Sequence, residues 1–289
     1  MVLDTHTHAW GPPTRDHPWV NGPLVEEFVT GFSVDPVYRA EDLLADMDEN
    51  GIDEAVVVGY PICEWTDNWY TLEAVRDHDR LRGIVMVDQF ADGAAGRLRE
   101  HMAVDGIDGF RLGAACPYDR MWEGFDPTTT WLLDAIEETA FFEAARATDA
   151  LVQVLVTTDQ LDQAVELVET YPELTYAFDH FAHADPDVPP GEGGFAAFET
   201  LASYDVAVKV SEVPHVSDAG FPYEDIHDHV RWLLETFGRE RVVWGSDFPN
   251  VSDVASYEQS VRWLDHVDVL SEADRTWLTE RAYRDLTGS

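Results

Sequence analysis

The hydrophobic pattern of the chain alternates short apolar runs with longer segments in which apolar residues recur every three or four positions. Short runs rich in Val, Ile and Leu are typical of strands buried in a parallel sheet, and the longer pattern is typical of amphipathic helices. The predicted strands cover residues 1–8, 53–59, 81–87, 106–113, 151–156, 174–179, 206–210 and 241–246. The predicted helices cover residues 39–50, 67–78, 93–102, 131–148, 159–170, 195–203, 224–238, 256–266 and 273–286.

This order of elements predicts an α/β fold, a (β/α)8 TIM barrel that forms a single domain over residues 1–289. The alternative fold is an open, doubly wound sheet. Such a sheet is typically marked by a glycine-rich phosphate-binding loop after a strand, and no strand of this chain is followed by one. The barrel is therefore the favoured architecture.

A long loop rich in Pro, Gly and aromatic residues, from about residue 9 to residue 36, follows the first strand. Long loops are uncommon unless they are functional, and a loop in this position stands beside the mouth of a barrel. The residues that would wall a pocket there are Trp10, Arg15, His17 and Trp19. A surface flap with ordinary aromatic anchors would show the same composition.

The charge balance is strongly acidic, with 57 Asp and Glu against 18 Lys and Arg and a net charge of −39. A hydrophobic content of 45% and ten Trp residues exclude a disordered acidic chain. The mutual repulsion of so many acids would weaken a compact fold in dilute buffer, whereas molar salt shortens the Debye length to about 3 Å. We therefore expect a salt-loaded cytoplasm, as in a halophile, and we exclude nucleic acid and anionic membranes as partners.

The compartment predicted from the sequence is the cytoplasm. We find neither a cationic leader with an apolar core nor an apolar run of membrane-spanning length. The two cysteines, Cys63 and Cys116, have no metal-type spacing and do not form a disulfide framework. The expected partner is a small-molecule substrate, and a homo-oligomer is possible.

Candidate chemistry begins at His6 and His8, which lie two residues apart in the first strand and so share one face of it. By itself such a pair is explained equally well by chance occurrence in a solvated loop. Asp247, at the end of the last strand, changes the interpretation, because a carboxylate there needs a cation or a proton-transfer partner. Barrel closure makes the first and last strands neighbours, so the three side chains are predicted to share one site.

Further polar residues fall at strand ends, where barrels carry their reactive groups. They are Arg111, Gln153, His180, His183, Lys209 and Ser211. Imidazole, carboxylate and guanidinium groups together suit hydrolysis or decarboxylation of an anionic carbonyl compound. Arg111 would also suit a structural ion pair and His183 a loop cap, whereas Lys209 needs either a buried partner or a functional anion.

The sequence resembles the amidohydrolase superfamily, in its amidohydrolase-related branch of metal-dependent TIM-barrel hydrolases. The stretches that carry the resemblance are Asp4-Thr-His-Thr-His8, Gly106-Ile-Asp-Gly-Phe-Arg111, Asp179-His-Phe-Ala-His183, Val208-Lys-Val-Ser211 and Trp244-Gly-Ser-Asp-Phe-Pro249. The resemblance implies that His6, His8, His180 and Asp247 are metal ligands or their metal-free equivalents, with one divalent ion, zinc by expectation. Members commonly carry a ligating His on strand five, where this chain has Gln153, and metal-free lactonases are known in the branch.

The first functional hypothesis is a hydrolase that opens a lactone or a similar cyclic ester or amide of a small carboxylate. Asp247 would act as general base on water, while His6, His8 and His180 polarise the carbonyl. Arg111 would hold a substrate carboxylate, and the remaining substrate-binding candidates are Gln153, Lys209, Trp10 and His183. The alternatives are a metal-dependent, non-oxidative decarboxylase of an aromatic or unsaturated acid, and a binding or scaffold protein with a decayed site.

Overall fold

The computed structural model describes residues 1–28, 36–118, 120 and 125–289. Its centre is a sheet of eight parallel strands that follow one another in sequence order. The strands are β1 (Leu3–Thr7), β2 (Glu54–Val58), β3 (Leu81–Met86), β4 (Ile107–Leu112), β5 (Leu151–Val154), β6 (Tyr176–Phe178), β7 (Val206–Val210) and β8 (Val242–Trp244).

The sheet closes on itself just beyond the end of β8. Thr7 forms a parallel bridge with Phe248, and the backbone N–H of Asp247 donates to the carbonyl oxygen of His6 at 2.8 Å. The predicted single-domain TIM barrel is thereby confirmed. Its closure brings His6 of the first strand next to Asp247 after the last strand.

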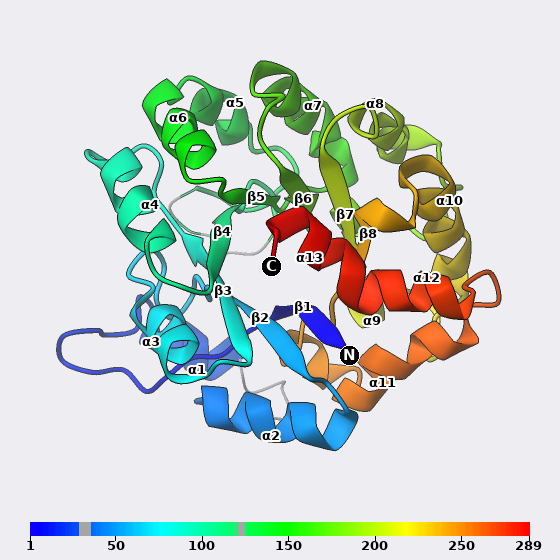
Figure 1. Cartoon of the computed structure of the whole chain (residues 1–289), viewed down its shortest axis with the longest axis horizontal. Helices are drawn as coiled ribbons and strands as arrows, with labels where there is room; N and C mark the ends of the chain where they lie inside the picture. The colour runs from blue at the N-terminus through cyan, green and yellow to red at the C-terminus, as the bar shows by residue number, and fades with distance from the viewer. Residues whose placement is uncertain (29–35, 119, 121–124) are drawn as a thin grey trace.

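Helices surround the strands in a ring (Figure 1). They are α1 (Gly22–Phe28), α2 (Ala40–Asn50), α3 (Trp69–Asp77), α4 (Ala94–Met102), α5 (Trp131–Ile136), α6 (Thr139–Ala147), α7 (Leu161–Thr170), α8 (Phe198–Leu201), α9 (Val213–Val216), α10 (His227–Phe237), α11 (Tyr257–Arg262), α12 (Glu272–Thr276) and α13 (Ala282–Thr287). Among the described residues, no helix combines the length and the apolar character needed to cross a membrane.

The structure adds a short helix, α9, that was not predicted, and two predicted elements differ from it. The helix predicted over 131–148 is divided into α5 and α6, because α5 packs against α7 while α6 packs against α4. The loop predicted over 9–36 contains α1, whose Pro23 lies in the first turn, where a helix needs no backbone N–H donor. Residues 29–35 of that predicted loop lie outside the described part of the chain.

The C-terminal helix covers one end of the barrel, and this fixes the site at the other. Figure 1 shows α13 crossing the ring of strands on the side where the chain begins. Tyr283 packs in an apolar cluster with Leu3 and Val243, and its hydroxyl donates to Asp108 Oδ2 at 2.8 Å. Asp108 also pairs with Arg82. The opposite mouth, at the carboxyl ends of the strands, is where barrel enzymes place their chemistry.

Candidate active site

The structure brings the polar residues predicted at strand ends to one mouth of the barrel. Most of them are buried, with no more than 6% of their surface exposed: His6, His8, Arg111, Gln153, His180, Lys209, Ser211 and Asp247. His183 is partly exposed, with 16% of its side chain accessible. A buried cluster of this polarity is stable only if its members satisfy one another.

Four imidazoles form a continuous row across the mouth. Ring centroids are 5.2 Å apart between His8 and His6, 4.6 Å between His6 and His180, and 5.2 Å between His180 and His183. One end of the row faces Asp247, whose Oδ1 lies 3.1 Å from His8 Nε2 and 3.5 Å from His6 Nε2. The other end faces Glu212, so a carboxylate stands at each end of the row.

The His8 ring can be oriented from its hydrogen bonds. Its Nδ1 lies 2.8 Å from the carbonyl oxygen of Val58, which can only accept, so Nδ1 carries a proton. A neutral His8 therefore directs a lone pair toward Asp247 Oδ1, and a proton or a cation is needed between these two atoms. His6 Nε2 is buried nearby and has no hydrogen-bond partner among the described residues.

These atoms fit a divalent cation. One ligand atom each from His6, His180 and Asp247 lies within 4.8 Å of the others, and His8 Nε2 adjoins the group. Imidazole nitrogen and carboxylate oxygen are the ligand types of catalytic zinc. The ordering of each ring by a second contact, Val58 for His8 and Ser211 Oγ at 2.9 Å for His180 Nδ1, is also typical of metal ligands.

Asp179 is the centre of a second network, which adjoins the row at His6. Its Oδ2 accepts hydrogen bonds from Arg111 Nε at 2.8 Å and Gln153 Nε2 at 3.0 Å. Its Oδ1 lies 3.4 Å from both Lys209 Nζ and His6 Nδ1. Burial raises the pKa of Asp179, but the charges of Lys209 and Arg111 outweigh burial and hold that pKa well below its usual range.

The two cations of this network, Lys209 and Arg111, contact different residues besides Asp179. Lys209 is fully buried, and its Nζ lies 3.0 Å from Gln153 Oε1 and 3.1 Å from His6 Nδ1. Burial lowers the pKa of Lys209 to about 8, although the charge of Asp179 raises it. Arg111 reaches further toward the mouth, since its Nη2 lies 3.3 Å from His180 Nε2.

Burial and neighbouring charge also set the protonation of the row. Burial, followed by the charge of Lys209, lowers the pKa of His6 to about 3. Burial tends to raise the pKa of Asp247, but its hydrogen bond with His8 and its electrostatic interactions with the His180 and His6 rings outweigh burial and leave that pKa below its usual range. Asp247 is therefore an ionised carboxylate beside a neutral His6 at neutral pH.

The backbone is left-handed at three neighbouring strand ends. Residues 180–183 follow β6 with φ between 37° and 55°, Glu212 follows β7 with φ 57°, and Asp247 follows β8 with φ 62°. Each left-handed residue with a side chain costs about 1 kcal/mol or more. Such strain is concentrated where side chains must be aimed at a function, and here it aims His180, Glu212 and Asp247 at the mouth.

Gly245 and Asp4 hold β8 against β1 below Asp247. A Cβ on Gly245 would lie 2.8 Å from the Cβ of His6, so glycine is required for this approach. Asp4 Oδ1 accepts from the backbone N–H groups of Ser246 and His6, and its Oδ2 accepts from the Tyr257 hydroxyl at 2.9 Å. The first strand therefore positions the general-base candidate as well as the two imidazoles.

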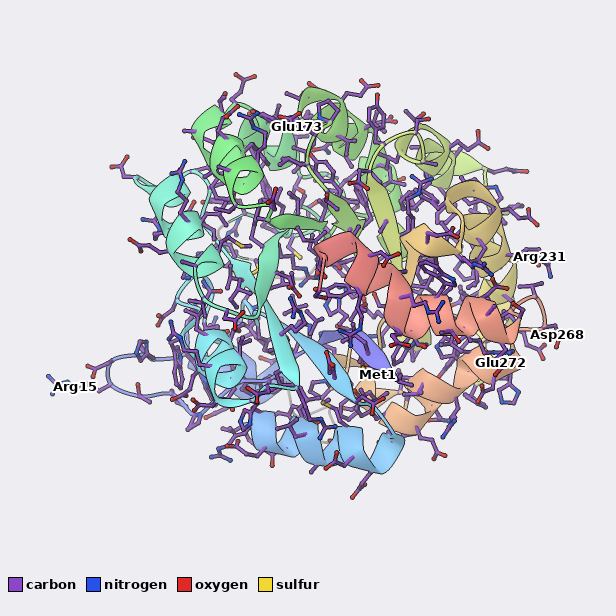
Figure 2. The ribbon with its side chains drawn as sticks, viewed as in Figure 1. Met1, Arg15, Glu173, Arg231, Asp268 and Glu272 are labelled. Atoms are coloured by element: carbon purple, nitrogen blue, oxygen red, sulfur yellow. The ribbon has the colours of Figure 1, made fainter. Side chains whose placement is uncertain are left out.

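The other residues proposed to wall the pocket lie farther out. Trp10 is buried behind Tyr60, with ring centroids 4.7 Å apart, and Tyr60 in turn lies 4.8 Å from the His8 ring. Arg15 projects from an outer loop (Figure 2). His17 pairs with Asp67 at 2.7 Å on the outside of the barrel. Trp10 thus supports the row through Tyr60 rather than contacting it.

Two site residues were expected from the sequence only as barrel acids that, like Asp108, could pair with Arg111 or Lys209, and neither was a predicted site residue. Asp179 precedes His180 in the Asp-His-Phe-Ala-His stretch, and Glu212 follows Ser211 directly. Both therefore lie at strand ends, and that position was the available signal. A third residue, His215, lies next to Glu212: its Nδ1 is 3.1 Å from Glu212 Oε1, and its Nε2 is 2.7 Å from Asp253 Oδ1.

Known proteins resemble this chain along almost its whole length. The L-fucono-1,5-lactonase of Burkholderia ambifaria is 27% identical over 272 residues, covering 88% of this chain and 82% of that protein. A probable 2-pyrone-4,6-dicarboxylic acid hydrolase of Acinetobacter baumannii, crystallised with citric acid, has a TM-score of 0.79 at 19% identity, with 100% and 99% of the two chains covered.

A structure of an amidohydrolase from Burkholderia multivorans with bound zinc also superposes with a TM-score of 0.79, at 20% identity and with 100% and 99% of the two chains covered. At these identities the two solved structures show the shared fold. The model of the amidohydrolase family itself matches residues 3–282, which include every strand and every residue of the imidazole row. The resemblance found in the sequence is thereby confirmed, and the chain belongs to the amidohydrolase family.

Proposed function

We propose that this chain is a hydrolase that opens the ester bond of a lactone at the carboxyl-end mouth of the barrel. The observation that carries the proposal is the ionised Asp247 carboxylate, which faces His6 and His8 at 3.5 and 3.1 Å. A carboxylate beside the neutral imidazole of His6 suits proton abstraction from water. The 27% identity to an L-fucono-1,5-lactonase supports a lactone as the substrate.

In the proposed reaction, Asp247 accepts a proton from water as the water oxygen attacks the lactone carbonyl carbon. The ring C–O bond then breaks, the proton passes to the departing ring oxygen, and the product is a hydroxy acid. We assign the stabilisation of the oxygen on which negative charge develops to the Nη2 group of Arg111, which lies 3.3 Å from His180 Nε2. Asp179 holds Arg111 in that position.

The residues that would hold a zinc ion are His6, His8, His180 and Asp247. When bound, zinc supplies Lewis acidity and a water of lowered pKa. Gln153, at the strand-five position where many relatives have a ligand, is instead hydrogen-bonded to Asp179 and Lys209. This arrangement supports one ion rather than two. We propose that Lys209 supports His6, that Gln153 supports Lys209 and Asp179, and that neither contacts the substrate.

The proposed activity can be tested with a panel of lactones and unsaturated carboxylic acids. We expect acid release from lactones in a pH-stat, without release of CO2. Dialysis against a chelator should lower the activity at least tenfold, zinc should restore it, and elemental analysis should find about one zinc per chain. CO2 release without acid release would instead support the decarboxylase, and full activity after verified zinc removal would support a metal-free lactonase.

We further propose that the protein is adapted to a salt-rich cytoplasm. The support is the net charge of −39 on a chain that folds as one barrel. Many of the acids are exposed: the side chains of Asp48, Glu41 and Asp228 have about two-thirds or more of their surface accessible, at 68%, 69% and 71%. Repulsion among exposed charges is screened by salt, whereas buried pairs are affected much less.

Thermal unfolding should therefore shift upward by at least about 5 °C between dilute buffer and molar KCl, which corresponds to roughly 3 kcal/mol for a domain of this size. Differential scanning calorimetry measures the shift. Sucrose at equal osmolality is the control, because it stabilises compact states without screening charge. A midpoint that does not respond to KCl, or responds equally to sucrose, would contradict the adaptation.

A further inference from the structure

A second group of candidate metal ligands lies at the end of the imidazole row opposite Asp247. One ligand atom each from His180, His183 and Glu212 lies within 4.8 Å of the others. Glu212 Oε2 is 3.5 Å from His180 Nε2 and 3.7 Å from His183 Nε2. Ordinary N–H···O hydrogen bonds are about 2.7–3.2 Å long, whereas Zn–N bonds of about 2.0–2.1 Å separate two ligands of a tetrahedral zinc ion by about 3.3–3.4 Å. The observed separations are closer to those of a metal site.

A buried ligand atom without a partner supports the same interpretation. His183 Nε2 is buried and has no hydrogen-bond partner within the described part of the chain. Buried polar atoms are normally satisfied, and a metal ion that takes the lone pair of this nitrogen would satisfy it. Two imidazole nitrogens and one carboxylate oxygen are ligand types of zinc, whereas Mg²⁺ and Ca²⁺ prefer oxygen ligands alone.

His180 belongs both to this group and to the group of His6 and Asp247. Its Nδ1 lies 2.9 Å from Ser211 Oγ, and with Nδ1 as the donor only Nε2 has a lone pair for a metal ion. His180 can therefore serve one ion at a time. When it binds an ion at the second position, an ion at the first position keeps His6, His8 and Asp247.

The position at Asp247 should fill first, because it offers four ligands and the second position offers three. Glu212 also shares its negative charge with His215, whose Nδ1 is 3.1 Å from Glu212 Oε1. Burial lowers the pKa of His215, but its contacts with Glu212 and Asp253 outweigh burial and raise that pKa to about 9. A protonated His215 beside Glu212 weakens the attraction for a second cation. The second position therefore fills only in excess zinc.

We propose that His180, His183 and Glu212 form a second, weaker zinc site, and that zinc bound there inhibits the enzyme. The site depends on these ligands alone, whereas the inhibition rests on the proposed lactonase function. An ion on His180 Nε2 displaces Arg111 Nη2, which lies 3.3 Å from that nitrogen. Arg111 then no longer stabilises the reacting oxygen, and the zinc ion at Asp247 loses one ligand. Excess zinc is therefore inhibitory, although the first zinc supports the reaction.

The test measures zinc uptake by protein that already contains one zinc per chain. Equilibrium dialysis in molar KCl, which screens the surface acids, should reveal a second equivalent that binds about tenfold more weakly than the first, or weaker still. Glu212→Gln and His183→Gln should each weaken the second equivalent about tenfold or more and retain the first. The unmodified protein should lose at least about nine-tenths of its lactone hydrolysis as the second zinc binds, and each variant should resist this loss.

His17→Gln is the matched control. His17 pairs with Asp67 at 2.7 Å on the outside of the barrel, and the two residues belong to no group of three candidate ligands in the described part of the chain. This variant should keep both the second equivalent and the inhibition. Thermal midpoints in molar KCl establish that each variant is folded, and His183→Gln serves if Glu212→Gln does not fold.

The outcomes separate the zinc site from the inhibition and from the proposed function. A second equivalent that survives in both Glu212→Gln and His183→Gln would be an adventitious ion only, and it would overturn the site. Uptake that stops at one zinc, or loss of the first zinc in these variants, would also overturn it. A second zinc bound at Glu212 without loss of hydrolysis would overturn the inhibition. Failure to hydrolyse any lactone would remove the proposed function, and zinc uptake would still decide the site.

Discussion

Asp247→Asn should lower kcat for lactone hydrolysis by about 10⁴-fold. The amide keeps the size of the carboxylate but cannot accept a proton from water, and it also removes the negative charge that faces His6 and His8. KM should change much less, because the carboxylate acts in the transition state rather than in holding the ground-state lactone. Single-turnover acid release at saturating lactone measures the chemical step.

A surface substitution of the same type provides the control. Asp228 pairs with Arg231 on α10 and has 71% of its side chain exposed, so Asp228→Asn should retain full activity. If Asp247→Asn keeps more than about one-tenth of the activity while Asp228→Asn keeps all of it, Asp247 is not the general base. Zinc content of the folded Asn variant separates the loss of a base from the loss of a ligand.

The adjacency of His6, His8 and Asp247 could be predicted because closure of the barrel follows from the count and order of its strands. Parallel strands with a period of two also fix which residues share a face, so one strand pattern predicted both imidazoles. The structure then places His6 Nε2 3.5 Å from Asp247 Oδ1, across 241 residues of sequence. This part of the site depends on topology, which the hydrophobic pattern encodes.

The hydrogen-bond partners could not be predicted in the same way. Arg111 is explained equally well by a substrate carboxylate or by a buried acid, and the sequence offered several acids that could pair with it. Arg111 pairs with Asp179, which directly follows β6. The left-handed turn that redirects the chain begins at the next residue, His180, and the pairing depends on this turn. Residues other than glycine rarely adopt such a turn, so no residue type announces it.

The position of Glu212 beside His180 and His183 could not be predicted for a related reason. It stands in a chain with 57 acids, where one more carboxylate after a strand carries little information. Its left-handed backbone turns it toward His180 and His183, and His215 and Asp253 complete its surroundings from two other segments. Three-dimensional placement distinguishes it from the solvated acids, and composition does not.

Asp179→Ala should destabilise the fold by about 3–5 kcal/mol, the loss expected when a buried ion pair loses one partner. Here a single carboxylate faces two buried cations, Arg111 and Lys209, so the substitution removes the carboxylate that both cations share among the described residues. Urea denaturation in molar KCl measures the free energy of unfolding, because urea does not add to the ionic strength. Arg111→Met should cost less than Asp179→Ala, since Lys209 and Gln153 still contact Asp179 in that variant.

Combining Asp179→Ala with Lys209→Met tests the cause of this loss. If unpaired charge is responsible, removing the ammonium group should recover roughly 1–3 kcal/mol of the stability lost in Asp179→Ala, a coupling that a double-mutant cycle isolates. Loss of packing alone would make the two substitutions additive, because methionine and lysine fill similar volumes. A cost below about 1 kcal/mol for Asp179→Ala would show that water reaches Arg111 and Lys209, in spite of the 6% and 0% exposure of these residues.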